Sequence, residues 1–155
     1  MNDAVTADVI VRPAFDLADY DVHTNAERGM PMPLMHPRSL TPLVNADGTK
    51  VTITMLGRAS DTYRDLQRVI NEENVLRQSQ GVRTTLDDVT AENTRMLLVC
   101  CKAWNLDRLD GRPFPYSEEN ARRLFTDPRF IWVRDAALMF MRNDGNFLPT
   151  ASRGS

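Results

Sequence analysis

The side chains best suited to metal binding and nucleophilic chemistry are few in this 155-residue chain. It contains two histidines, His23 and His36, and two cysteines, Cys100 and Cys101. A zinc site made from them would need ligands from the loose N-terminal part and from a packed helix together, which makes such a site a poor candidate. The sequence also lacks a phosphate-binding glycine loop, a dinucleotide fingerprint, an HExxH motif and a CxxC motif. We therefore predict no metal site and no cofactor.

The adjacent cysteines indicate packing more than redox chemistry. Side chains of neighbouring residues in a helix point about 100° apart, so a disulfide between Cys100 and Cys101 would be strained. Small apolar side chains of this kind are typical of a protein core in a reducing compartment. A redox role for the pair is the alternative.

Paired carboxylates are the remaining candidates for acid–base chemistry, and each pair falls at a helix start or on a polar helix face. The pairs are Glu72/Glu73, Asp87/Asp88 and Glu118/Glu119. Helix capping and solvation explain such positions better than catalysis does. We therefore predict that the protein is not an enzyme.

Composition and charge limit the classes of partner. The net charge of -2 and the isoelectric point of about 5.7 argue against nucleic-acid binding, which needs a basic face. No apolar run approaches the ~20 residues that cross a bilayer, and the N-terminus lacks the basic start and apolar middle of a signal peptide. We expect no nucleic-acid partner, no membrane partner and a cytoplasmic location.

The chain divides into an arm, one domain and a tail. Residues 1–30 are acidic and offer too little apolar surface to offset the entropy of ordering them alone, so we predict a flexible arm. A single domain is expected over residues 31–148, followed by a polar, disordered tail at 149–155.

Prolines and methionines alternate at the start of this domain, in the sequence GMPMPLMHP at 29–37. The three prolines keep the backbone extended and outside a helix, and methionine side chains adapt to many partner shapes. The segment therefore has two interpretations, an edge strand or a docking strip for another protein.

A β-hairpin is predicted at about 40–57. The apolar run at 40–44 and the alternating run VTITM at 51–55 flank a turn that contains Asp47-Gly48, a pair that adopts positive φ at low cost. Two strands alone are marginal in water. The hairpin therefore needs a helix, a third strand or another subunit to cover its apolar face.

Four helices are predicted at about 60–79, 85–106, 118–126 and 128–143. Ser60, Thr84 or Thr85, Ser117 and Asp127 are the expected N-caps, and Pro128 suits the first turn of the last helix. We predict an α+β fold class: a mainly α-helical domain with an N-terminal β-hairpin and a flexible arm.

Three stretches together resemble a known protein family. They are the hairpin end VTITMLGRASDTYR, the helix expected to end at Trp104, and the run GRPFPYSEENARRLFTDPRFIWVRDAALMF followed by NFL. This set, which covers about residues 31–148, is similar to the tail assembly chaperones of long-tailed (siphophage-type) bacteriophages and prophages. The resemblance is one of packing and capping residues and includes no chemical motif.

The resemblance implies a non-enzymatic protein of phage morphogenesis. Such a protein binds the tape measure protein, keeps it soluble and recruits tail tube subunits in the host cytoplasm, and it is absent from the mature virion. Self-association is a further possibility, because the uncovered hairpin and the methionine-rich strip allow a monomer, a dimer or a ring. The alternative that we keep open is a structural virion protein, either a head–tail connector or a minor tail protein.

The residues of the stretch 110–148 are mostly explained by capping and core packing. The partner surface is therefore expected at the margins of this stretch, at Trp132 and Met139, or in the methionine- and proline-rich strip at 30–37. Trp104 and Phe114 are expected to be buried. The candidate partner-binding residues are Met30, Met32, Leu34, Met35, Trp132 and Met139.

Overall fold

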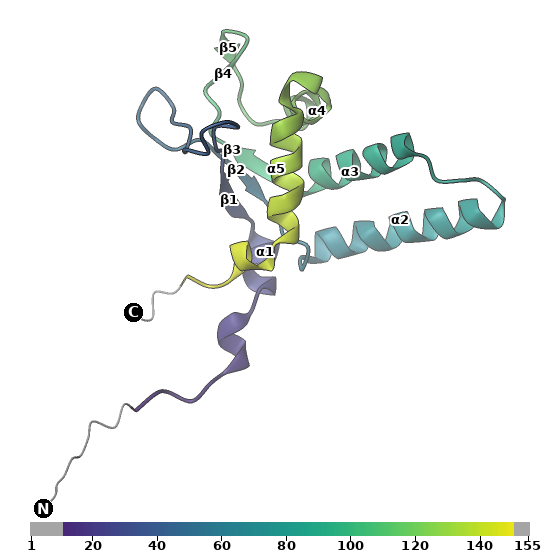
Figure 1. Ribbon diagram of the computed structural model, residues 1–155, viewed down its shortest axis with the longest axis horizontal. Coiled ribbons are helices and arrows are strands. Elements are labelled where there is room, and N and C mark those ends of the chain that lie inside the picture. The colour runs from purple at the N-terminus through teal and green to yellow at the C-terminus, as the bar shows by residue number, and fades with distance from the viewer. Residues whose placement is uncertain (1–10, 151–155) are drawn as a thin grey trace, which may run out of the picture.

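The central strand of the molecule is β2 (Thr52–Met55), which belongs to a three-stranded antiparallel sheet in this computed structural model (Figure 1). The structure describes residues 11–150. β1 (Met30–Pro33) pairs with one edge of β2 and β3 (Cys101–Trp104) with the other. The sheet therefore joins three segments that lie far apart in the sequence.

β1 is an edge strand. Its register places Met32 opposite Ile53, and Met32 is buried while Pro31 and Pro33 are exposed. Proline has no N–H to donate and is tolerated where a strand has an unpaired side. The edge-strand interpretation of this segment is therefore confirmed.

The predicted hairpin at about 40–57 is only partly present. Its turn forms, with Gly48 at a φ of 89°. Residues 40–44 form no strand of the sheet, however, and Leu43 makes only local backbone hydrogen bonds, each of 2.9 Å, to the segments beside it. Two causes explain the difference: Pro42 has no N–H to continue a ladder, and β1 and β3 already occupy both edges of β2.

α2 (Asp61–Ser79) and α3 (Leu86–Cys100) form an antiparallel hairpin that projects from the body (Figure 1). The predicted caps are confirmed. The Ser60 hydroxyl accepts from the N–H of Tyr63, and Thr85 forms a capping box with Asp88.

The prediction of a helix over 85–106 is wrong beyond Cys100, where the chain enters β3. Helix propensity is a weak force compared with tertiary pairing. Ile53 lies opposite Trp104 in the sheet, and the Trp104 ring packs on Phe114. These non-local contacts favour a strand at this position.

The C-terminal helices follow their predicted boundaries. α4 (Glu118–Thr126) is capped by Ser117. The expected helix at 128–143 begins as a short 3-10 turn, η2 (Pro128–Phe130), and continues as α5 (Ile131–Arg142). A last 3-10 turn, η3 (Asp144–Phe147), folds back so that the rings of Phe140 and Phe147 meet edge to face, with centroids 5.3 Å apart.

The predicted arm at 1–30 is shorter than expected. Residues 11–21, which include the turn η1 (Leu17–Tyr20), are exposed, but α1 (His23–Arg28) packs on the body through the buried Ala26. The reason is a close fit, because the Ala26 carbonyl accepts a hydrogen bond of 3.1 Å from the Gly57 N–H. Residues 1–10 and 151–155 of the predicted arm and tail lie outside the described residues.

One hydrophobic core joins the sheet to α3, α4 and α5. A small hairpin, β4 (Arg108–Leu109) and β5 (Arg112–Pro113), leads to the buried Phe114. Asp110-Gly111 forms the turn between these two strands, and both of its residues have positive φ. The largest fully buried side chains are Phe125, Phe147, Ile53, Met55, Leu97 and Met141.

Candidate functional site

An apolar cleft of about 750 Å³ lies beside the sheet, and it is lined by two of the residues that the sequence singled out, Leu34 and Trp132. Its walls come from the segment after β1, from the 106–109 stretch and from α4, η2 and α5. The apolar residues that line the cleft are Leu34, Leu43, Val44, Val51, Leu106, Leu109, Phe114, Leu124, Phe130, Trp132 and Val133.

Local hydrogen bonds hold the first wall of the cleft in place. The Leu43 N–H donates to the Leu34 carbonyl and the Val51 N–H donates to the Leu43 carbonyl, each at 2.9 Å. Leu34 and Val51 are buried, whereas Val44 is 57% exposed at the mouth. This wall therefore offers an apolar surface on a backbone that is already fixed.

The polar rim is equally well fixed. Asn45 lines the cleft, and its side-chain amide donates to the Asn105 carbonyl at 2.9 Å. An Asp107 carboxylate oxygen accepts from the Ala46 N–H at 3.0 Å. Since these polar groups are already paired with the backbone, a ligand of the cleft would contact mainly apolar atoms.

The opposite wall is fastened by Arg129. Its guanidinium contacts carboxylate oxygens of Asp110 and Asp127, each at 2.8 Å, and lies 5.0 Å from the centre of the Phe130 ring. The hydrogen bonds from Arg129 hold the pKa of both carboxyl groups below the ordinary value. This network ties the β4–β5 turn to the start of α5.

The other candidate residues do not line this cleft. Met32 is 3% exposed and belongs to the core, so it has no surface to offer a partner in this conformation. Met30 is half-buried in β1. Met35 is 37% exposed and Met139 is 74% exposed.

Sequence reasoning missed several lining residues of the cleft. The predicted helix over 85–106 includes Leu106, and Leu109 falls in the connection that follows this helix. Their spacing on either side of charged residues, just before the Asp110-Gly111 turn, was the available signal. Phe114 is expected from the sequence only as a buried residue.

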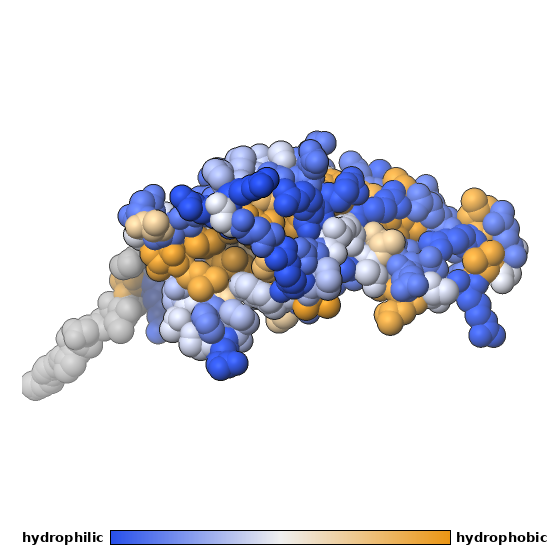
Figure 2. All heavy atoms as spheres, turned by 90° about the horizontal axis from the view of Figure 1, so that it is seen from above, coloured by the Kyte–Doolittle hydropathy of each residue, from blue (hydrophilic) through white to orange (hydrophobic). Residues whose placement is uncertain are grey.

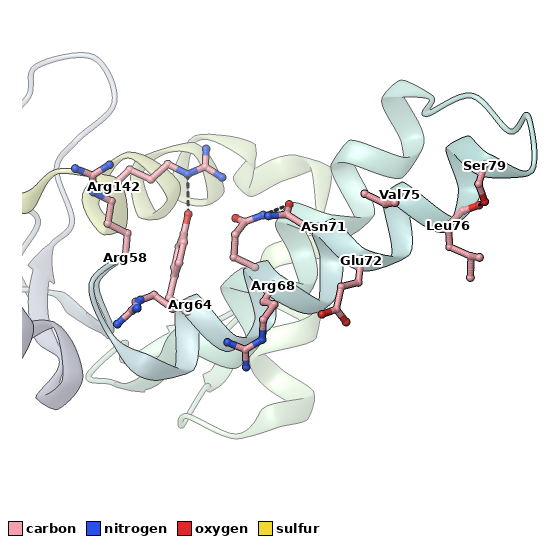
Figure 3. A pocket seen from close by; sticks show the side chains of 11 residues that line it. Arg58, Arg64, Arg68, Asn71, Glu72, Val75, Leu76, Ser79 and Arg142 are labelled. Atoms are coloured by element: carbon pink, nitrogen blue, oxygen red, sulfur yellow. Dashed lines mark hydrogen bonds between the residues drawn. The ribbon is translucent and has the colours of Figure 1, made fainter.

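A second hollow, the α2 groove, runs along one face of α2 and has a volume of about 890 Å³. Figure 3 shows Arg58 and Arg142 near one end and Val75, Leu76 and Ser79 toward the other. Arg142 donates to the Tyr63 hydroxyl at 3.4 Å, and Arg58 pairs with Asp144. Of the charged side chains that line it, four are arginines and one, Glu72, is acidic.

One group of described residues has the composition of a metal site. Single ligand atoms of His23, Glu27 and Asp61 lie within 4.8 Å of one another, and all three residues are exposed. Glu27 also accepts a hydrogen bond of 2.7 Å from the Asp61 N–H at the start of α2. Helix capping therefore explains why these side chains gather here.

The cysteines have the environment of core residues. Cys100 and Cys101 are buried as unbridged thiols, and burial raises the pKa of each to about 12. They are therefore protonated at neutral pH, unlike the thiolates of redox and nucleophilic sites.

Apolar surface also remains exposed outside the cleft. Figure 2 shows a broad hydrophobic area on the body and further apolar side chains at the far end of the α2–α3 hairpin. At that end Val82 is 47% exposed and Leu86 is 81% exposed. Among residues 11–150, no helix combines the length and apolar character needed to cross a bilayer.

Comparisons with protein-family models, with curated proteins and with solved structures found no match.

Proposed function

We propose that this protein is a non-enzymatic tail assembly chaperone of a long-tailed phage or prophage, and that its apolar cleft binds the tape measure protein. The observation that carries the proposal is the cleft itself, in which Leu34 and Trp132 lie among apolar residues from several separate parts of the chain. A fixed apolar cleft with paired polar groups at its rim suits binding of apolar side chains better than it suits bond-breaking chemistry.

The chemistry of the expected partner fits such a cleft. A long helical protein carries an apolar stripe that is insoluble when exposed, and a helix side chain from this stripe can enter a groove of this kind. Many copies of a chaperone with one modest cleft each would cover the stripe by weak, repeated contacts and release it on assembly. This is the behaviour that a temporary coat requires.

Recruitment of tail tube subunits needs a second surface. The end of the α2–α3 hairpin lies away from the body and exposes Val82, Leu86 and Val89. We assign the tail tube contact to this end. The protein would act in the host cytoplasm and leave before the virion is complete.

Co-expression with the tape measure protein of the same genome tests the proposal. We expect the tape measure protein to stay in the soluble fraction with the wild-type chain and to precipitate with Val44→Glu, which puts a charge at the mouth of the cleft. Ile131→Glu is the matched control, because Ile131 is 58% exposed, close to the 57% of Val44, and does not line the cleft. Equal insolubility of the tape measure protein with and without the wild-type chain would refute the chaperone.

A structural virion protein, such as a head–tail connector or a minor tail protein, is the second candidate. The exposed segment at 11–21 favours it, since extended arms commonly link neighbouring subunits of an assembly. Mass spectrometry of purified virions separates the two functions. A chaperone is expected to be missing from virions, whereas a connector is present in stoichiometric amounts.

A further inference from the structure

The N-terminal segment, residues 11–20, carries several large apolar side chains that are exposed. This segment lies outside the body of the molecule (Figure 1). Phe15 is 76% exposed, Leu17 is 73% exposed and Tyr20 is 56% exposed, with the rings of Phe15 and Tyr20 stacked 5.6 Å apart. So much apolar surface on one short segment is typical of a segment that another surface covers.

The α2 groove is a surface of the complementary kind. Val75 is 66% exposed and Leu76 is 58% exposed at one end, and the aliphatic stems of Arg64 and Arg68 extend the apolar floor. The local partners of these arginines hold them weakly, since Arg64 contacts Asp61 only at 4.0 Å and both ion pairs are exposed. Their guanidinium groups can therefore turn toward another acidic group.

The charges on the two surfaces match in order and in spacing. In the segment, Arg12 precedes Asp16 by four residues, which is about 13 Å of extended chain. On the groove, Glu72 and Arg64 are eight residues apart, which is about 12 Å along a helix. If the segment runs antiparallel to α2 with Arg12 beside Glu72, Asp16 lies beside Arg64. Val11 then lies beyond Glu72, near Val75.

We propose that residues 11–20 of one copy of this protein dock in the α2 groove of a second copy. The second copy is favoured over the same chain because the segment leaves the body on the side away from α2 (Figure 1). The chain is held where the segment meets α1, because Asp21 accepts hydrogen bonds from the N–H groups of His23 and Thr24, at 2.7 Å and 3.2 Å.

Docking of this kind can link copies reciprocally or head to tail. Each copy has one segment and one groove, so two copies can exchange segments reciprocally, and more copies can close into a ring or extend as a chain. Docking at the groove uses none of the residues that line the cleft proposed above, so the segment itself leaves the cleft free.

A charge exchange tests the register. We expect the full-length chain to associate as its concentration rises, measured by light scattering after size exclusion. Arg12→Glu alone and Glu72→Arg alone are each expected to weaken association about three- to tenfold. The double variant should restore it, since Arg12 and Glu72 would meet with their charges exchanged. Arg38→Glu, an exposed change outside both surfaces, is the control and should associate like the wild type.

A wild-type chain that stays monomeric throughout the concentration series would overturn the proposal. So would a double variant that associates no better than the two single ones. Leu17→Ser provides an independent check, because it removes apolar surface without reversing a charge. It should also weaken association, while its thermal stability stays at the wild-type value.

Disulfide trapping tests whose segment enters the groove. Chains with Val11→Cys are mixed with chains with Val75→Cys under mild oxidation, and the native thiols compete little because both are buried. We expect a covalent species of twice 17.6 kDa, with much less of it when Met139→Cys replaces Val75→Cys. Failure to exceed that control would refute the docking. A chain that carries both Val11→Cys and Val75→Cys is the last test. If it forms only an intramolecular disulfide, the segment docks in its own groove and not in that of a second copy.

Discussion

The indole N–H of Trp104 donates a hydrogen bond of 2.8 Å to the carbonyl oxygen of Phe114, and the two rings stack with centroids 5.2 Å apart. Tyr116 meets the same indole edge to face, and its hydroxyl donates to the Cys101 carbonyl at 2.9 Å. β3 is thereby fastened to the segment that follows β5, and Phe114 is held in the wall of the cleft. The orientation of this cleft wall therefore depends on Trp104 and Tyr116, two aromatic side chains that do not line the cleft.

The aromatic cluster predicts a graded loss of stability. Phe114→Ala is expected to lower the free energy of unfolding by about 3–5 kcal/mol, because it removes a buried ring and leaves a cavity. Trp104→Phe keeps the stack but removes the N–H donor and should cost about 1 kcal/mol. Urea unfolding of the two variants measures both values. A Phe114→Ala variant with an unchanged midpoint would show that this ring contributes to partner binding alone.

Gly57 is predicted to resist even the smallest substitution. A Cβ atom at this position would lie 2.9 Å from the Ala26 Cβ and 2.9 Å from two carbons of the Phe147 ring. Gly57→Ala should therefore destabilise the fold by about 1–3 kcal/mol through overpacking. Adding Ala26→Gly removes one of the contacts and should recover part of the loss. If Ala26→Gly does not reduce the loss of unfolding free energy caused by Gly57→Ala, α1 does not pack on Gly57 as described.

The ion pair between Arg58 and Asp144 predicts a dependence of stability on pH. The hydrogen bonds from Arg58 hold the pKa of Asp144 below its ordinary value of 3.8. The folded state therefore gains stability from this pair above the unfolded pKa and loses it as the pH falls through the folded pKa. Asp144→Asn should lower the melting temperature slightly at neutral pH, because the pair is exposed.

The same comparison at acid pH is the internal control for this ion pair. Below the folded pKa, the wild type and Asp144→Asn should melt at the same temperature, since both then carry a neutral side chain at this position. A difference that persists unchanged at low pH would mean that the substitution acts through something other than the charge of Asp144 and its pairing with Arg58.

The two native thiols are predicted to be unreactive in the folded protein. Burial raises the pKa of Cys100 and of Cys101 to about 12, and alkylation requires both access and thiolate. Maleimide labelling at neutral pH should therefore be slow, and both thiols should react once denaturant is added. A Val75→Cys variant supplies an exposed thiol for comparison. Rapid labelling of the wild type at the rate of that variant would contradict the buried position.

The helix boundaries could be predicted because their signals are local. Ser60, Thr85, Ser117 and Asp127 each cap the helix that follows them within three residues, and this depends on nothing distant. The strand at 101–104 could not be predicted in the same way. Its residues become a strand only because β2 offers an unpaired edge to which they can bond.

The candidate site was foreseen in part. Leu34 and Trp132 were marked as apolar residues near recognisable elements, and both line the cleft. Met32 is also a candidate from the sequence. Side chains alternate between the two faces of a strand, however, so Met32 points into the core while its neighbours Pro31 and Pro33 face outward. Leu106 and Leu109 line the cleft because the chain passes beside it after β3, and composition alone does not reveal that path.

The position of β2 between two distant strands bears on how the chain folds during its synthesis. β1 and β2 are made early, and the α2–α3 hairpin can form from local contacts, but the second edge of β2 is filled only after α3 is complete. Phe147, which packs against Gly57, arrives later still. During that interval a nascent chain presents an open β edge, and neighbouring nascent chains on one messenger are then most prone to pair wrongly.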